Sequence, residues 1–471
     1  MIQNPTQPTV AIAGGGLAGL AAACALADSD FRVTLFERRP YLGGRASSYQ
    51  HPGTGEVVDN CQHVLFRVCT NLVEFYHRIG VEDKICWFDE MTFIEPGGRT
   101  SVMHASPLPA PLHTAPSFLG FPFLSAKDKL VISRALAKLA LTAQPDTGRS
   151  FLDWCNQQGQ TQNAIDRFWK PILVSALSED LDLISIPAAA QVVRESMKSP
   201  AARHMGVPSI PLTDLYNHAG DYIRARGGEI RLRTSLESFS PESSQGRIQL
   251  SDKSETAFDY LVLALPFDAL ERVLPQSPEA APLRDQIAHF ESSPITGIHL
   301  WFDRQITDLD HAVLLDRTVQ WMFNKSRLLA TRGAANPEAS GSYIELVVSA
   351  SNSLIDKSRA EIVDLALKEV REFFPAARAA NLVKSTVIKE VHATYSPRPG
   401  IDALRPQQST AWPRVFLAGD WTATGWPATM EGAVRSGYLA AEALARSAGV
   451  EHSPFMVPDL PAAGLMRLFT K

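Results

Sequence analysis

Short apolar runs separated by glycine and polar residues define the first part of the chain. The run at 10–13 leads into the glycine-rich segment 14–19, and a stretch rich in alanine and leucine follows before a second apolar run ends at Glu37. This order predicts a strand, a tight turn, a helix and a second strand. The continuous apolar run at 260–266 lies between breakers and predicts a further strand buried in a parallel sheet.

The pattern changes twice further along. Residues from about 105 to 208 have a mainly helical pattern, and a helix at 215–225 then precedes mixed strands. The elements expected after residue 294 are antiparallel strands at 298–302, 319–323 and 343–348, a helix at 359–374 and a last strand at 383–395. The fold class is therefore α/β, with a Rossmann-like domain interrupted by an α+β part of antiparallel sheet plus helices.

These changes predict interleaved domains. The Rossmann-like, nucleotide-binding domain is expected to be discontinuous, at 1–100, 209–292 and 396–450. A substrate-binding domain is expected at 101–208 and 293–395, with a C-terminal tail at 451–471.

The glycines of the first turn have the spacing Gly14-x-Gly16-x-x-Gly19. Between a strand and a helix this spacing is typical of dinucleotide binding. The first glycine allows the tight turn, the second lets the backbone approach a pyrophosphate, and the third lets helix and strand pack closely. Leu17 and Ala18 begin the helix, whose free N–H groups are expected to point toward the phosphates.

The segment after the second strand indicates a cofactor longer than NAD. Glu37 is placed to accept hydrogen bonds from ribose hydroxyls, as the acid of a dinucleotide site does. Arg38 follows it directly, and a second glycine pair with an arginine comes at Gly43-Gly44-Arg45. NAD domains do not need this loop, so we expect a longer cofactor to lie over it.

A second nucleotide element lies near the C-terminus, where an apolar strand ends in Gly419-Asp420 and a helix follows. Asp420 is expected to accept from ribityl or pyrophosphate-linked hydroxyls, and the positive end of the helix is expected to face the flavin pyrimidine edge. The residues expected around that end are Ala428, Thr429, Met430 and Ala433. Leu236 is expected to lie against adenine. Together these elements predict FAD.

Composition and charge exclude several classes of protein. The chain has 471 residues, 45% hydrophobic and 20% charged, which suffices for a substantial core and two domains. A net charge of -5 with scattered Lys and Arg gives no reason to expect a nucleic-acid partner. The five cysteines form no Cys-x-x-Cys and no cluster with histidines at metal spacing. We therefore expect no metal, reduced thiols and a cytoplasmic location.

An apolar segment at 106–124 is rich in proline, phenylalanine and leucine, and the helix expected after it carries Lys127, Lys129, Arg134 and Lys138. Two interpretations remain open. In the first, lipid head groups meet these cations on the inner face of the cell membrane, and the side chains that enter the bilayer interface are Phe118, Phe121, Phe123 and Leu124. In the second, the segment packs irregularly on its own domain.

These motifs resemble those of the flavin amine oxidase and phytoene desaturase superfamily. More narrowly, the segments 57–65 and 418–437 resemble the squalene-associated FAD-dependent desaturases, better described as hydroxysqualene dehydroxylases. The resemblance covers most of the chain. It implies reductive removal of the allylic hydroxyl of hydroxysqualene, which yields squalene for hopanoid or related triterpenoid synthesis.

That reaction needs a hydride and a proton. Reduced flavin supplies the hydride, after reduction by an external electron donor that the sequence does not identify, and an acid protonates the departing hydroxyl. His63, Glu431 and Asp59 are the candidates for proton delivery, since each lies in a segment expected near the flavin. Structural roles remain open for all three, in turns or in the first turn of a helix.

Other functions remain open as well. The same flavin site working in the opposite direction would make a carotenoid or phytoene-type desaturase. Amine oxidation is a third function, although Trp426 offers only one half of the aromatic cage that it usually needs. A non-redox prenyl-binding escort protein belongs to another class, and the intact phosphate elements argue against it.

Aromatic residues in two expected strands bear on the substrate. His299 and Trp301 lie two positions apart, as do Trp321 and Phe323, so each pair shares one face of its strand. These faces either pack in a core or line a tunnel for a long isoprenoid.

Overall fold

The computed structural model describes residues 7–53, 55–241, 245–330 and 341–469. Its first sheet has five strands in the order β10-β2-β1-β14-β20, and every neighbouring pair is parallel. The strands are β1 (Thr9–Ala13), β2 (Arg32–Glu37), β10 (Glu229–Leu232), β14 (Tyr260–Leu263) and β20 (Val415–Leu417). The prediction of a Rossmann-like parallel sheet assembled from separate parts of the chain is confirmed.

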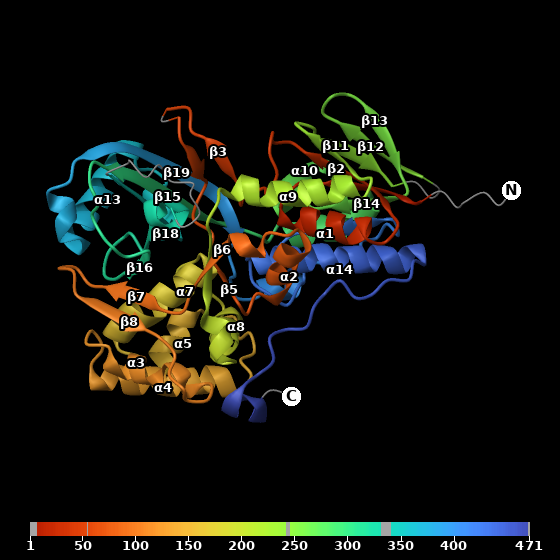
Figure 1. Cartoon of the computed structure of the whole chain (residues 1–471). Coiled ribbons are helices and arrows are strands. Elements are labelled where there is room, and N and C mark those ends of the chain that lie inside the picture. Colours follow the sequence, from red (N-terminus) through yellow and green to blue (C-terminus); the bar gives the residue numbers. More distant parts are fainter. Residues whose placement is uncertain (1–6, 54, 242–244, 331–340, 470–471) are drawn as a thin grey trace.

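Three helices that are distant in sequence lie side by side beside this sheet (Figure 1): α1 (Leu17–Ala27), α9 (Leu212–Ala225) and α14 (Met430–Ala448). Helix α1 is apolar on all sides because α9, α14 and the sheet cover it. A Cβ atom on Gly437 of α14 would overlap the carbonyl oxygen of Ala18 in α1. The absence of a side chain at Gly437 therefore lets the two helices pack closely.

A second sheet of seven strands has the order β19-β15-β18-β17-β16-β7-β8. Its strands are β7 (Met91–Ile94), β8 (Thr100–Met103), β15 (Ser292–Phe302), β16 (His311–Leu314), β17 (Trp321–Asn324), β18 (Ser342–Ser349) and β19 (Leu382–Tyr395). Its neighbours are antiparallel, as predicted, apart from the parallel pair β7 and β16. Because β7 and β8 join this sheet, we propose that the first domain boundary lies near residue 90 rather than 100.

The register of the second sheet separates its two faces. His299 of β15 lies opposite Glu345 of β18, and Phe323 of β17 also lies opposite Glu345, so these three side chains share one face. The alternate residues pack with α13 (Arg359–Phe373) on the other face, as Ile298 and Leu346 do. The face of His299 and Glu345 is the one that meets the rest of the molecule.

The region between the two parts of the first domain is helical, as predicted. Its helices are α3 (Ala115–Gly120), α4 (Ala126–Leu141), α5 (Phe151–Gln157), α6 (Gln162–Ala164), α7 (Lys170–Leu177) and α8 (Ile186–Met197), with a π-helical turn at Ile165–Trp169. A capping box formed by Ser125 and Asp128 fixes the start of α4.

The structure corrects one prediction in this region. The four side chains expected to enter a membrane interface are buried in the core of their own domain: Phe118, Phe121, Phe123 and Leu124. Phe121 stacks on Phe123, and Phe118 meets Phe168 edge to face, so the aromatic rings satisfy one another inside the protein. For these residues the irregular packed segment is the correct interpretation.

Smaller elements complete the fold. The remaining helices are α2 (Thr70–Arg78), α10 (Phe267–Val273), α11 (Ala281–Ile287) and α12 (Lys325–Ala330). The remaining strands are β3 (Ser48–Gln50), β4 (Val57–Asp59), β5 (Leu65–Phe66), β6 (Ile85–Phe88), β9 (Met205–Pro208), β11 (Leu236–Ser240), β12 (Gly246–Leu250) and β13 (Glu255–Phe258). Among the residues described, no helix is both long enough and apolar enough to cross a membrane.

Candidate active site

The glycines of the first turn have two different structural roles. Gly14 has a φ of 111°, and a Cβ atom there would overlap the carbonyl oxygen of Ala264. A Cβ on Gly19 would overlap the carbonyl oxygen of Gly14, so the fold itself requires both glycines. A Cβ on Gly16 would have only the Cα of Gly44 near it, at 3.8 Å. Gly16 thus leaves open space beside the start of α1, where a pyrophosphate can approach the backbone.

The carboxylate of Glu37 organises the loop around this turn. One oxygen accepts from the backbone N–H of Gly15 at 2.7 Å and the other from that of Arg39 at 2.8 Å. Each oxygen keeps a lone pair, and the pair can accept from ribose hydroxyls. Arg39 also donates to the carbonyl of Gly44 at 2.6 Å, whereas Arg38 is exposed. Arg39, which the sequence analysis did not single out, is thus the arginine that secures the second glycine pair.

The second glycine pair lies against the first. Gly43 and Gly44 have φ angles of 104° and 61°, and the N–H of Gly43 donates to the carbonyl of Gly15 at 2.9 Å. A Cβ on Gly44 would come within 2.8 Å of the Cα of Gly16. The two glycine segments therefore form one continuous backbone surface without side chains.

An ion pair at this surface joins two segments that are distant in sequence. The guanidinium of Arg45 lies 2.7 Å from the carboxylate of Asp420, and it also donates to the carbonyl of Ala393. Arg405, which the sequence analysis missed, donates to the carbonyls of Asp420 and Thr422. These contacts hold the segment that begins at Gly419 against the loop of the first nucleotide element, as the motifs predicted.

The start of α14 is a capped helix end. The hydroxyl of Thr429 accepts from the N–H of Gly432 at 3.1 Å, and the sulfur of Met430 accepts from the hydroxyl of Tyr216 at 3.6 Å. Ala428 is buried and Ala433 is partly buried beside this end. Leu236 packs in the core on the other side of the parallel sheet, with Ala13 and Phe36 among its neighbours.

The structure gives Glu431 a full set of structural contacts. Its carboxylate is buried and accepts from the N–H groups of Asn71 and Leu72 at the start of α2. The guanidinium of Arg435, one turn later in α14, lies 2.6 Å away. These donors occupy both carboxylate oxygens and tie α2 to α14, so we leave Glu431 out of the proton-delivery proposal.

Asp59 is the charged partner of a lysine that the sequence analysis missed. Its carboxylate lies 2.8 Å from the ammonium of Lys325 and accepts from the hydroxyl of Ser48 and the N–H of Leu212. Burial alone would raise the pKa of Asp59, but Lys325 and these hydrogen bonds outweigh it and hold the pKa below its usual range. Asp59 is therefore ionised and has no proton to give.

His63 lies in the loop between β4 and β5. Its Nδ1 is 2.7 Å from the carbonyl oxygen of Cys61, so Nδ1 donates and Nε2 is left as the free ring nitrogen. Burial lowers the pKa of His63, and the imidazole is neutral at neutral pH.

Glu345 is the second residue that the sequence analysis missed, and it shares the charge of Lys325. The ammonium lies 3.5 Å from one carboxylate oxygen, and among the described residues neither oxygen accepts a hydrogen bond of normal geometry. Burial, opposed by Lys325 and reinforced by Asp59, raises the pKa of Glu345 to about 8. Two carboxyl groups thus share one ammonium, and Glu345 is the one that keeps its proton.

The sheet face around Glu345 is aromatic. His299 lies opposite Glu345, its Nδ1 is 2.8 Å from the hydroxyl of Tyr343, and Tyr343 stacks on Trp301. Burial and the charge of Lys325 lower the pKa of His299 to about 3, so its ring is neutral. The predicted sharing of one face by His299 and Trp301, and by Trp321 and Phe323, is confirmed by the register.

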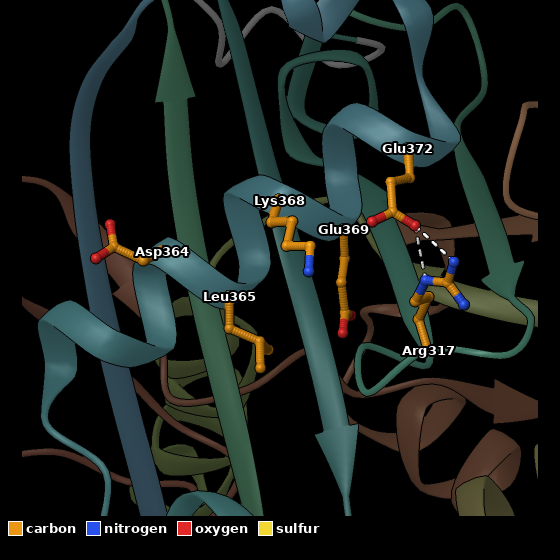
Figure 2. A pocket seen from close by; sticks show the side chains of 6 residues that line it. All are labelled: Arg317, Asp364, Leu365, Lys368, Glu369 and Glu372. Atoms are coloured by element: carbon orange, nitrogen blue, oxygen red, sulfur yellow. Dashed lines mark hydrogen bonds and ion pairs between the residues drawn. The ribbon is translucent and has the colours of Figure 1, made fainter.

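A hollow of about 350 Å³ on the outer side of α13 is a separate feature. Figure 2 shows its charged lining, in which Arg317 forms an ion pair with Glu372. Glu369 beside them accepts from the N–H groups of Thr318 and Val319. Since α13 covers the face of the sheet that is opposite to Glu345, this hollow does not belong to the candidate active site.

Comparisons with known proteins agree with this geometry. A family model described as flavin containing amine oxidoreductase matches residues 17–445. The chain is 27% identical over 463 residues to the 15-cis-phytoene desaturase of Synechococcus elongatus, which covers 92% of this chain and 95% of that protein. It is 26% identical over 459 residues to the 15-cis-phytoene desaturase of Solanum lycopersicum, which covers 94% and 78%.

Solved structures show the same fold at lower identity. Putrescine oxidase with bound putrescine has a TM-score of 0.71 at 16% identity, and the match covers 94% of this chain and 99% of that one. A putative protoporphyrinogen oxidase from an Exiguobacterium species has a TM-score of 0.67 at 16% identity, with 95% and 100% covered.

Proposed function

Because this chain belongs to the flavin-containing amine oxidoreductase family and is an FAD-dependent oxidoreductase, we propose that it is a hydroxysqualene dehydroxylase. In this proposal it removes the allylic hydroxyl of hydroxysqualene and yields squalene for hopanoid or related triterpenoid synthesis. The glycine surface, Glu37, Arg45 and Asp420 would hold the FAD. An external electron donor has to reduce the flavin in each cycle.

The observation that carries this proposal is Glu345, a buried acid that keeps its proton near neutral pH beside an aromatic wall. Reduced FAD held by these residues would supply the hydride for the new C–H bond, while the C–O bond would break and the hydroxyl would leave as water with one added proton. Glu345 beside Lys325 would store that proton, and His63 would relay it by accepting it at the free Nε2 and passing it from there to the hydroxyl. The aromatic wall would stabilise a delocalised allylic cation better than bulk water would.

A carotenoid or phytoene-type desaturase is the second candidate, and the phytoene desaturases among the relatives favour it. Desaturation removes a hydride and a proton from the substrate. Glu345 keeps its own proton and so would not accept the substrate proton, and the free Nε2 of His63 would have to take that proton instead.

Two further candidates have less support. Amine oxidation usually uses an aromatic cage, but Trp426 is buried with the guanidinium of Arg435 stacked at 4.7 Å from its ring. A non-redox prenyl-binding escort protein would not need the glycine surface. Copurification of a yellow flavin distinguishes the enzyme from an escort.

The decisive experiment uses reduced holoenzyme under anaerobic conditions. Incubation with hydroxysqualene should oxidise the flavin and give squalene in stoichiometric amount, whereas phytoene should give no product. Formation of a desaturated product from phytoene by the oxidised enzyme, without squalene in the first reaction, would assign the desaturase function instead.

His63→Ala tests the delivery step. We expect at least about a hundredfold slower flavin oxidation by hydroxysqualene in a single turnover, because general acid catalysis contributes that much or more. FAD content should stay unchanged. An unchanged rate would remove His63 from the proposal.

The substrate also bears on location. A thirty-carbon isoprenoid partitions into lipid, so we propose a cytoplasmic protein in peripheral contact with the inner face of the cell membrane.

A further inference from the structure

Six large apolar side chains are exposed around one small contact cluster, which consists of Ala110, Ala140 and Met466. Each of the six lies within three positions of a member of that cluster. They form what we name the basal patch: Leu108, Leu112, Leu141, Leu465, Leu468 and Phe469. Leu468 is 77% exposed and Phe469 54% exposed.

The basal patch joins two distant parts of the chain. The N–H of Leu465 donates to the carbonyl of Ala110 at 2.8 Å, and that of Ala463 donates to the carbonyl of Lys198 at 2.9 Å. Figure 1 shows the C-terminal turn beside α4 and α8 at one end of the molecule. The exposed side chains are therefore one surface on an ordered support and not scattered positions.

Helix α4, whose end lies at the basal patch, carries exposed cations. Between residues 104 and 145 the single acidic residue is Asp128, which is buried and caps α4. The exposed cations of α4 are Lys127, Arg134 and Lys138, and Arg467 lies inside the patch. Apolar side chains next to exposed cations are complementary to a bilayer that carries anionic head groups. Two copies of the patch would bring like charges together, which disfavours self-association.

We propose that the basal patch is the surface by which this protein docks on an anionic lipid bilayer. The inference rests on the proposed function only in that a lipid-soluble substrate gives the contact a purpose. It replaces the buried phenylalanines as the membrane-facing residues and adds the C-terminal turn, which the sequence analysis had assigned to a tail.

The test is sedimentation of the holoenzyme with vesicles of phosphatidylcholine alone or mixed with phosphatidylglycerol. Wild type should bind the mixed vesicles more tightly, and added salt should weaken that binding. The double variant Leu112→Ser with Leu468→Ser should lower the partition coefficient at least about tenfold, because less apolar surface enters the bilayer. The matched control is Val383→Ser with Val391→Ser, which removes two exposed apolar side chains from the edge strand β19 and should bind as wild type does.

Circular dichroism and flavin content should be the same for all three proteins. Equal vesicle binding by wild type and L112S/L468S would overturn the proposal, as would an equal loss in the control. A dimer in buffer that only L112S/L468S abolishes, without vesicle binding by wild type, would assign the patch to self-association. Vesicle binding by a wild type that does not convert hydroxysqualene would count against the proposed function and not against the surface.

Discussion

Glu345 keeps its proton near neutral pH, where an ordinary glutamate is negatively charged. Its burial beside a lysine that is already paired with Asp59 leaves it without a counter-ion of its own. Its protonated form is therefore part of the folded structure, and the stability of the protein should depend on pH through this residue.

We predict that Glu345→Gln changes this dependence. An unfolded glutamate loses its proton near pH 4.3, whereas Glu345 keeps it up to about pH 8, so the folded state binds the extra proton between these values. The free energy of unfolding of wild type should fall relative to that of E345Q as pH rises through this window, by on the order of a few kcal/mol, and then level off. Urea denaturation at several pH values measures it.

Glu369→Gln is the matched control, since Glu369 is a buried glutamate of α13, the helix that packs on the opposite face of the same sheet. It removes a buried carboxyl group without touching Lys325 or Asp59, so it controls for the substitution itself. Infrared spectra add a second measurement: a carboxylic-acid carbonyl band at neutral pH should be lost in E345Q. Persistence of that band would contradict the assignment.

The glycine surface allows a prediction that separates binding from folding. Gly16→Val should lower FAD affinity by about 10- to 100-fold, equivalent to about 1–3 kcal/mol of steric conflict, because its side chain enters the open space beside α1. The apoprotein should unfold as wild type does, since nothing in the fold occupies that space. Glu37→Ala should also lower FAD occupancy. Flavin absorbance after dialysis checks both, and full retention by both variants would contradict the placement.

Single residues differ in how far the sequence could predict them. Gly14, Gly16 and Gly19 are local signals, because their spacing alone encodes the turn. Lys325 begins α12, and Glu345 lies in β18. Only the register of the second sheet brings these two residues next to Asp59. No short pattern carries that information, so the sequence analysis named Asp59 and missed both partners.

At the scale of elements, the packing of α1 against α14 contributes to the stability of the first domain. Gly437→Val places a Cβ atom against the backbone of α1, at 2.9 Å from the nitrogen of Ala22, and backbone cannot move aside as a side chain can. We expect a loss of about 1–3 kcal/mol in the free energy of unfolding. Gly120→Ala, where no atom lies within 4 Å of the new Cβ, should change it by less than about 0.5 kcal/mol. Equal stability of G437V and wild type would contradict this account of the helix pair.

Elements with a strong hydrophobic pattern could be predicted from the sequence. The surroundings of an element that depends on tertiary packing could not. The apolar run at 260–266 became β14 because a buried parallel strand needs no polar face. Phe118 and its neighbours gave the same apolar signal, but whether protein or lipid covers such a run depends on packing partners such as Phe168.

For the whole molecule, the arrangement predicts that FAD binding and folding are coupled. The ion pair between Arg45 and Asp420 bridges chain segments that lie 375 positions apart in sequence, and the cofactor would add to that bridge. FAD at a hundredfold excess over its dissociation constant should raise the free energy of unfolding by about 2.7 kcal/mol. Thermal unfolding of apoprotein and holoenzyme measures this, and equal melting temperatures would contradict it.

The packing of α1 against α14 also has a consequence during protein synthesis. The ribosome makes the first glycine turn and α1 long before it completes α14, the helix that packs against α1 and ends at Ala448. A nascent chain stalled before Val415 lacks β20, Asp420 and α14. Such a chain should leave the side of α1 that packs against α14 uncovered and available to chaperones, and cofactor insertion should be among the last events of biogenesis.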